Sequence, residues 1–168
     1  IMTAGGASVN IIPSEADLES YIRGASLQAI AEANCKVNRA LAAGALALGA
    51  KVSVSDRPGY APLVNSPELA KLAGECMTEL LGAQNVKVTD DWTTGCTDMG
   101  DISCIMPCIH PHIAGAAGKS HGDDYHIVNV ETACVNSAQG QLLLAYELLK
   151  DGARKAKEVV AAYRAPYA

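Results

Sequence analysis

The chain contains no phenylalanine and a single tryptophan among its 168 residues. Hydrophobic residues nevertheless make up 49% of it, as in ordinary globular proteins. Any core must therefore be built from Ala, Leu, Ile and Val, and disorder is excluded for most of the length. The net charge of 13 − 18 = −5 argues against a nucleic-acid partner. Because no apolar run approaches the ~20 residues of a membrane helix, we expect no membrane partner either.

The six cysteines show no C-x-x-C spacing, which speaks against a zinc ribbon or a thioredoxin motif. We interpret them as reduced, mostly buried thiols of a cytoplasmic protein. Cys96 is the exception to this interpretation, because it lies in a turn rich in Gly and Thr. The first residues carry no signal-peptide pattern, and a chain that opens with Ile1 has the look of a partial chain.

Hydrophobic periodicity predicts alternating strands and helices. In the first part we expect a β-hairpin over residues 1–23, a helix over 26–48 with Ser26 as N-cap, and a strand over 51–55. The breaks at residues 56–59 and at Pro62 mark the best internal boundary. Beyond it we expect a helix over 67–81, a strand over 86–89, a loop-rich region over 90–126, a helix over 130–149 and a last helix over 153–163. The alternation favours the α/β class.

All four histidines lie between residues 110 and 126, in a region that also holds several aspartates. Imidazole and carboxylate are the usual protein ligands of zinc. His110 and His112 share one face if their segment is extended. Clustered histidines are also common as hydrogen-bonding groups, so residue chemistry alone leaves a metal site and a structural cluster both open.

Four motifs in chain order resemble one known family. Residues 5–13 (GGASVNIIP) resemble its G-G-x-x-x-N-[VI]-[IV]-P signature, and residues 59–65 (GYAPLVN) resemble the junction between its two domains. Residues 97–103 (TDMGDIS) and 109–111 (IHP) resemble a stretch of one branch. The family is that of the co-catalytic-metal amidohydrolases: aminoacylases, glutamate carboxypeptidases and p-aminobenzoyl-glutamate hydrolases. The branch is the β-alanyl-lysine dipeptidase-like one.

The resemblance implies an α/β fold made of two parts. Residues 1–56 would be part of a small α+β lid domain, which forms the dimer contact in the family. Residues 57–168 would be the C-terminal part of a three-layer α/β metal-binding domain. The family's remaining metal ligands and its general base lie upstream of the region that this chain matches, so no catalytic residue is expected within it.

One metal ligand of the family does lie in the matching region, as a His that follows a Gly-rich loop. His121 in residues 118–122 (GKSHG) is the best match, and His126 is the competing choice. The counterpart of His110 has a structural role in the family, and His112 has no assignment. The implied cofactors are two divalent metal ions, usually zinc, with manganese or cobalt as alternatives.

Four further residues are implied to bind substrate. Asn10 and Arg23 would line the lid's substrate face, where a guanidinium can grip a carboxylate through two parallel hydrogen bonds. Gly95 and Cys96 would offer backbone donors near the carboxyl end of the substrate. Asp98 would order their turn.

The resemblance implies a metal-dependent amidohydrolase or dipeptidase, cytoplasmic and homodimeric through the lid. In the full-length protein a water activated by two metals would hydrolyse an amide bond of an N-acyl amino acid, an aminobenzoyl-glutamate-like compound or a dipeptide. This chain alone would be inactive. Two alternatives stay open: a stand-alone, non-catalytic module that dimerises or binds carboxylate ligands, and an ordinary α/β domain with structural histidines.

Overall fold

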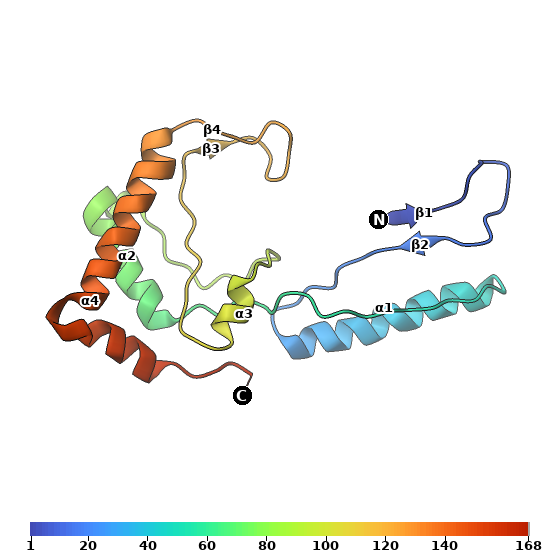
Figure 1. The fold of residues 1–168 in the computed structure, drawn as a ribbon, viewed down its shortest axis with the longest axis horizontal. Helices are drawn as coiled ribbons and strands as arrows, with labels where there is room; N and C mark the ends of the chain where they lie inside the picture. The colour runs from blue at the N-terminus through green and yellow to red at the C-terminus, as the bar shows by residue number, and fades with distance from the viewer. Residues whose placement is uncertain (168) are drawn as a thin grey trace. The chain divides into compact units, whose positions relative to one another are not determined.

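The computed structural model describes residues 1–167 and divides the chain into two compact units, Ile1–Pro58 and Gly59–Ala168 (Figure 1). The division falls beside the predicted boundary, while the assignment of the units to a lid and a metal-binding domain stays a prediction. Helices are mixed with two small antiparallel sheets of two strands each. Among the described residues, no helix has both the length and the hydropathy needed to cross a membrane.

Unit 1 begins with the predicted β-hairpin, which is confirmed but short. Strand β1 (Met2–Ala4) pairs antiparallel with β2 (Asp17–Leu18). Helix α1 (Leu27–Ala47) follows, and the predicted N-cap is confirmed because the Ser26 hydroxyl accepts a hydrogen bond from the Ala29 N–H at 3.1 Å. Two residues beyond the helix, Gly49 adopts a φ of 67°, a conformation that favours glycine.

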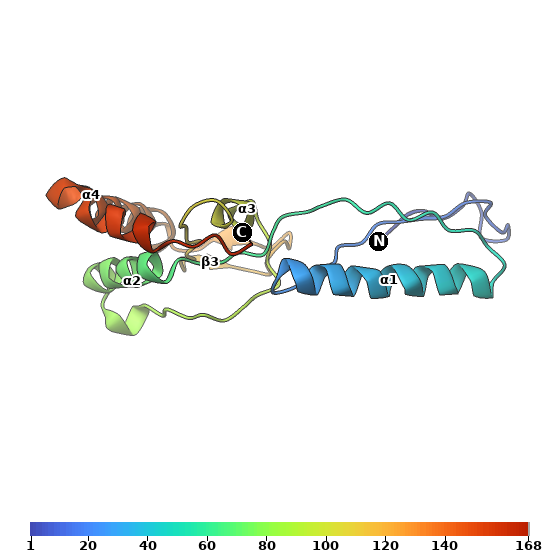
Figure 2. The ribbon, with the colours of Figure 1, turned by 90° about the horizontal axis from the view of Figure 1, so that it is seen from below.

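The segment after α1 returns along the helix without forming the strand predicted over residues 51–55 (Figures 1 and 2). That prediction is wrong because no neighbouring strand in the described chain offers this segment a backbone partner. A side-chain clamp fixes its end instead. The Asp56 carboxylate accepts hydrogen bonds from the Nδ2 atoms of Asn34 and Asn38, each at 2.8 Å. These two residues lie four apart on one face of α1.

No residue of unit 1 is buried. Helix α1 was predicted from its apolar stripe, yet Leu27 and Leu41 on that stripe are 43% and 42% exposed. Ile12 in the hairpin loop is 94% exposed. A stripe of this kind normally packs against a second layer. The elements of unit 1 therefore carry apolar faces that the unit itself does not cover.

Unit 2 contains the remaining elements. They are α2 (Pro67–Leu81), the 3-10 turn η1 (Ala83–Asn85), α3 (Met99–Ser103), β3 (Ala116–Ala117), β4 (His126–Ile127), the π-helical turn η2 (Glu131–Asn136) and α4 (Ser137–Ala162). The prediction of α2 is confirmed at both ends, with Ser66 as N-cap and Gly82 as C-cap. The strand predicted over residues 86–89 is not formed.

Helices α2 and α4 pack side by side and supply most of the small core (Figures 1 and 2). A Cβ atom built on Gly140 would lie 2.3 Å from the Met77 sulfur, so the absence of a side chain there permits the close approach. Leu72 and Cys76 on α2 and Val159 on α4 are buried. Ala, Leu and Val are present in this core as expected, whereas the share of sulfur-containing side chains, Cys76 and Cys108 among them, was not expected.

Helix α4 is broken at residues 150–153, which confirms the predicted stop near Asp151. The Glu147 carboxylate braces the break by accepting hydrogen bonds from the ammonium groups of Lys150 and Lys155. The bond from Lys150, together with that from Lys155, lowers the pKa of the Glu147 carboxyl. The two ion pairs of Glu147 are therefore formed at neutral pH, and they are lost as the pH falls through this lowered pKa.

A hydrogen-bonded node around Ser103 fixes α3 within unit 2. The Ser103 hydroxyl donates to the Gly100 carbonyl at 2.6 Å and accepts from the Val64 N–H at 3.2 Å. The Ser103 carbonyl accepts from the Tyr163 hydroxyl at 2.8 Å. Desolvation raises the pKa of the Tyr163 phenol, so this hydroxyl stays protonated as a donor. Asp101 Oδ1 adds a fourth link by accepting from the Ala61 N–H at 2.8 Å.

The chain exposes 12607 Å² of surface. A compact monomer of this size exposes about 7,900 Å², and two separate globular bodies about 9,400 Å² together. Many large hydrophobic side chains contribute to this exposed surface. Apolar surface of this extent is typical of elements that pack against another polypeptide.

The cysteines are free, as predicted, but they are not mostly buried. Cys76 and Cys108 are buried, whereas Cys35 and Cys134 are exposed. Desolvation raises the pKa of both buried thiols, which keeps them protonated and inert. The two exposed thiols lie on α1 and on η2, whose outer faces nothing in the described chain covers.

The close contact of α3 predicts that Gly100→Ala destabilises unit 2. An added Cβ atom would lie 1.8 Å from the Ala61 carbonyl oxygen, a backbone atom that cannot rotate away. We expect a loss of about 3 kcal/mol or more, as for severe overpacking, measured by urea denaturation. Gly59→Ala is the matched control, because nothing lies within 4 Å of that position. Equal stability of the two variants would contradict the described contact.

Candidate functional site

Gly95 and Cys96 lie in the turn that leads into α3. Gly95 is exposed and Cys96 is half-buried. Within the described part of the chain, neither of their N–H groups donates a hydrogen bond. Two adjacent N–H groups without a protein acceptor, beside a fixed helix, are chemically able to bind a carboxylate or an oxyanion.

Thr97, rather than Asp98, orders this turn. The Thr97 hydroxyl accepts a hydrogen bond from the Met99 N–H at 3.3 Å and makes a second bond, also at 3.3 Å, to His110 Nδ1. Asp98 occupies the N-cap position of α3 but makes no capping hydrogen bond with its side chain. The role expected for Asp98 is therefore wrong. A Thr hydroxyl bonding the N–H two residues on is a known turn device, and this local signal could have identified Thr97.

His110 and His112 lie on one face of their segment, as their spacing predicts. Their rings stack with centroids 5.7 Å apart and an interplanar angle of 23°. The bond from His110 to Thr97 ties this segment to the turn before α3. This structural role of His110 agrees with the one that the resemblance implies for it. For His112, the contact described is the stacking of its ring on His110.

His121 lies at the tip of the hairpin formed by β3 and β4. Its imidazole is exposed, and its backbone has a φ of 62°, in the left-handed region that non-glycine residues seldom occupy. Gly118, with a φ of 94°, allows the tight turn, because a Cβ atom there would lie 2.3 Å from the Asp124 carbonyl oxygen. Asp124 Oδ1 accepts a hydrogen bond from the Lys119 N–H at 3.1 Å and closes the loop.

His126, the competing ligand, lies on β4 of the same hairpin. Its Nδ1 lies 2.7 Å from the Asp124 carbonyl oxygen. Because a carbonyl can only accept, Nδ1 must carry the proton, and Nε2 is left as an acceptor in the neutral ring. Metal-binding histidines are oriented in this way. The geometry thus keeps His126 as a second candidate beside His121.

The residues present do not form a metal centre by themselves. Among residues 1–167, no three side chains of His, Cys, Asp or Glu converge to hold an ion. A closed zinc site needs three or four protein ligands. The hairpin can offer one imidazole, or at most two, to ligands supplied from elsewhere.

Asn10 and Arg23 both belong to unit 1. The Asn10 side-chain oxygen accepts a hydrogen bond from the Ser8 hydroxyl. The Arg23 guanidinium lies over the Tyr21 ring, 5.8 Å from its centroid, and its side chain is exposed. Stacking on an aromatic face orients a guanidinium.

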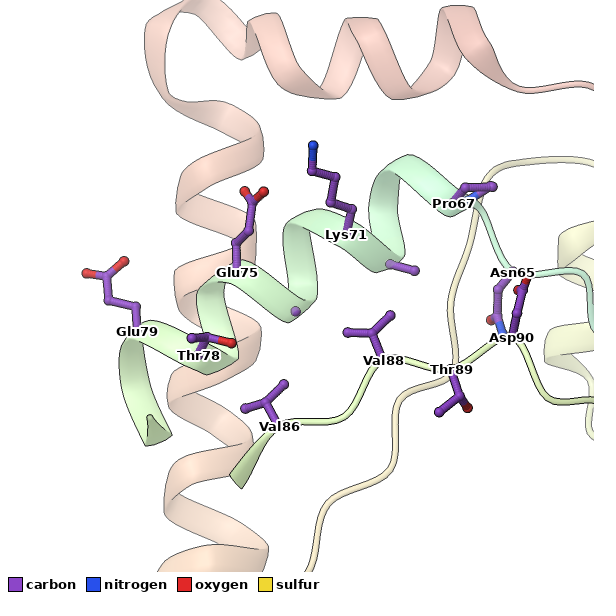
Figure 3. Close-up of a pocket in the computed structure, with 12 residues that line it drawn as sticks. Asn65, Pro67, Lys71, Glu75, Thr78, Glu79, Val86, Val88, Thr89 and Asp90 are labelled. Atoms are coloured by element: carbon purple, nitrogen blue, oxygen red, sulfur yellow. The ribbon is translucent and has the colours of Figure 1, made fainter. Parts of the chain in front are cut away.

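A groove of about 790 Å³ in unit 2 was not expected from the sequence. Residues 86–90 run beside α2, and Figure 3 shows Val86 and Val88 pointing toward the helix and Thr89 pointing away. A Cβ atom on Gly74 would lie 2.6 Å from Val88 Cγ2, so the absence of a side chain lets the segment approach α2. Val88 is nevertheless 60% exposed.

Sequence reasoning also missed the roles of Gly100, Asp101 and Ser103. These residues were noticed as part of a family motif, whereas the structure uses them to seat α3 on residues 61–64. The available signal was the short run of small and polar residues itself. Their partners lie about 40 residues away in the chain, which no local pattern reveals.

Comparison with known proteins gives one informative match. The chain is 29% identical over 129 residues to the Xaa-Arg dipeptidase of Mus musculus, which covers 74% of this chain and 30% of the relative. The chain thus spans less than a third of the length of this curated relative. No family model matches the chain. No solved structure matches it either.

The match relates the chain to a peptidase. It covers most of the chain, and it agrees with the general enzyme class that the four motifs imply. The particular branch, the metal and the substrate belong to the proposal below.

The role of Asp124 predicts that Asp124→Ala loosens the hairpin loop. Loss of the bond to the Lys119 N–H should speed amide hydrogen exchange at Lys119 by about tenfold, the value of an ordinary hydrogen bond of ~1.4 kcal/mol. Asp123→Ala is the matched control, because no hydrogen bond of Asp123 occurs among the described residues. Equal exchange rates in both variants would contradict this account of the loop.

Proposed function

We propose that this chain is part of a metal-dependent amidohydrolase or dipeptidase. Its substrates would be dipeptides, N-acyl amino acids or aminobenzoyl-glutamate-like compounds. The observation that carries the proposal is the similarity to a dipeptidase over 74% of the chain. The four motifs and their order support the same class.

Substrate recognition is the part of the chemistry that this chain's own residues perform. Arg23 binds a substrate carboxylate through its guanidinium, and Asn10 contributes an amide. The N–H groups of Gly95 and Cys96, which no backbone carbonyl among the described residues accepts, bind a carboxyl or carbonyl oxygen. Carboxylates are present in every proposed substrate, which is why these donors suit the class.

His121 is the proposed contribution to the metal centre, with zinc as the expected metal and manganese or cobalt as alternatives. Its position at a loop tip, with an exposed ring, supports this role. A bound metal would supply Lewis acidity to the site. Since the described residues do not complete a site, the other ligands and the general base come from outside this chain.

A second candidate is a non-catalytic module that dimerises or binds carboxylate ligands. The observation that favours it is the same: among the described residues, no three potential metal ligands converge. The two functions differ in whether the complete gene product binds zinc and hydrolyses a dipeptide.

The metal role predicts that His121→Asn in the complete gene product lowers zinc content and activity. Asparagine tolerates a positive φ, so the loop keeps its backbone while the imidazole is lost. We expect hydrolysis of an Xaa-Arg dipeptide to fall by more than the ~10–100-fold that loss of an outer-shell partner costs. Zinc per chain is measured by mass spectrometry after dialysis.

His126→Asn and His112→Asn are the companion variants. An effect confined to His126→Asn assigns the ligand to His126 instead. Unchanged zinc and activity in all three variants would support structural histidines and overturn the metal role. A complete gene product that binds no zinc and hydrolyses no substrate in the wild-type form would favour the non-catalytic module.

The role of Arg23 predicts a binding defect in Arg23→Lys. Lysine keeps the positive charge but loses the planar pair of donors. We expect KM for a dipeptide to rise about tenfold or more, with little change in kcat, since a charge-assisted bond contributes ~1.5–3 kcal/mol. Arg39→Lys is the control, because the one hydrogen bond of the Arg39 side chain among the described residues goes to the Cys35 carbonyl on α1. An unchanged KM in Arg23→Lys would remove this residue from the site.

A further inference from the structure

The break in helix α4 at residues 150–153 is strained. Asp151, Gly152 and Ala153 have φ angles of 53°, 68° and 61°. All three values lie in the left-handed region, which glycine adopts readily and which a Cβ atom disfavours. An Asp side chain can offset part of this cost by local hydrogen bonding, whereas an Ala side chain cannot. The break therefore holds the end of α4 in a conformation that the backbone at Ala153 does not favour.

Residues 154–163 form a C-terminal arm beyond the break. Figure 1 shows this arm at an angle to the first part of α4. Within the arm, Val159 is the one buried residue. At the end of the arm, the Tyr163 hydroxyl donates its hydrogen bond to the Ser103 carbonyl of α3 at 2.8 Å. Segments that bury little apolar surface open at low free energy, so the arm depends on what holds it at the break.

The Glu147 carboxylate joins the two parts of α4. It lies before the break and accepts hydrogen bonds from Lys150 at 2.5 Å and from Lys155, in the arm, at 2.7 Å. The Glu147 side chain is only 16% exposed, so water and salt screen these two ion pairs less than a surface pair. Arg154 and Glu158 pair within the arm, but their side chains are 63% and 61% exposed, and such pairs contribute little.

The Glu147 bridge lies close to the buried Cys76 thiol of α2. Cys76 is 3% exposed. Burial raises the pKa of this thiol, Glu147 raises it further and Lys155 lowers it, which places both charges near the sulfur. Movement of the arm carries Lys155 away and removes part of this cover. The accessibility of Cys76 therefore reports whether the arm is attached.

We propose that the C-terminal arm is a detachable element, which the ionised Glu147 carboxylate holds in place against the strain at Ala153. Release of the arm uncovers Cys76 and breaks the hydrogen bond from Tyr163 to Ser103. Helix α3 is then freed at one of its attachments. Because α3 directly follows the turn of the candidate site, attachment of the arm helps to keep that turn in place.

The experiment introduces Glu147→Gln into the full chain and measures amide hydrogen exchange. Glutamine keeps the shape of the side chain but loses the charge that holds both lysines. We expect exchange in the arm and in α3 to become about tenfold faster, because hydrogen bonds to charged groups are the stronger class. Exchange in α1, in unit 1, should stay unchanged. Alkylation of Cys76 by N-ethylmaleimide, located by mass spectrometry, should accelerate by a similar factor.

Glu158→Gln is the matched control for this variant. It removes an exposed ion pair that lies within the arm and does not cross the break. Exchange in the arm and alkylation of Cys76 should therefore remain as in the wild type. Far-ultraviolet circular dichroism checks that every variant is folded.

Ala153→Gly tests the strain separately. Glycine adopts a φ of 61° without a Cβ penalty, so exchange in the arm should become about fivefold slower than in the wild type. Ala156→Gly, within the helical part of the arm, is the control, since glycine there should speed exchange as it does in an ordinary helix. Added to Glu147→Gln, Ala153→Gly should recover much of the lost protection.

Unchanged exchange in the arm and unchanged alkylation of Cys76 in Glu147→Gln would overturn the proposal. Faster exchange spread evenly over unit 2 would also overturn it, because the arm would then not detach by itself. A faster arm with an unchanged α3 would contradict the link through Tyr163. Faster exchange in Ala153→Gly, as in its control, would refute the strain at the break. These measurements involve neither zinc nor hydrolysis, so their failure is distinct from failure of the proposed function.

Discussion

The packing of α3 against residues 61–64 is the interaction on which unit 2 depends. Because Gly100 has no side chain, α3 can lie against the Ala61 carbonyl. The Ser103 hydroxyl accepts a hydrogen bond from the Val64 N–H and donates one to the Gly100 carbonyl of its own helix. The Ser103 carbonyl holds Tyr163, at the end of α4. A five-residue helix cannot be stable alone, since helix nucleation is costly. Its tertiary bonds therefore decide where the adjoining turn and the segment of His110 lie.

Burial is sparse everywhere else. Unit 1 buries no residue, and unit 2 buries a thin layer between α2 and α4. Each square ångström of apolar surface left in water forfeits ~25 cal/mol of stabilisation. The helices and extended segments thus carry apolar faces against which the described chain packs no second layer. The chain covers 30% of the length of the dipeptidase relative.

The candidate site residues share one physical character: they lie on turns and loops next to fixed elements. Gly95 and Cys96 precede the seated helix α3, and His121 lies at a tip closed by Asp124. This arrangement leaves donors and a ring exposed while the backbone beneath them is held. It suits recognition of carboxylates and donation of an imidazole, whereas proton transfer and metal assembly require further groups.

The sequence by itself determined the local elements. Ser26 and Ser66 as N-caps, Gly82 as a C-cap and the break at residues 150–153 follow from short-range rules, because caps and breaks act within one turn of chain. The tertiary structure alone decided which extended segments became strands, since a strand exists only where a neighbour supplies its hydrogen bonds. It also decided that Thr97 and Asp101, rather than Asp98, hold the site turn and α3. Partners 40 residues away are chosen by packing, which sequence spacing does not encode.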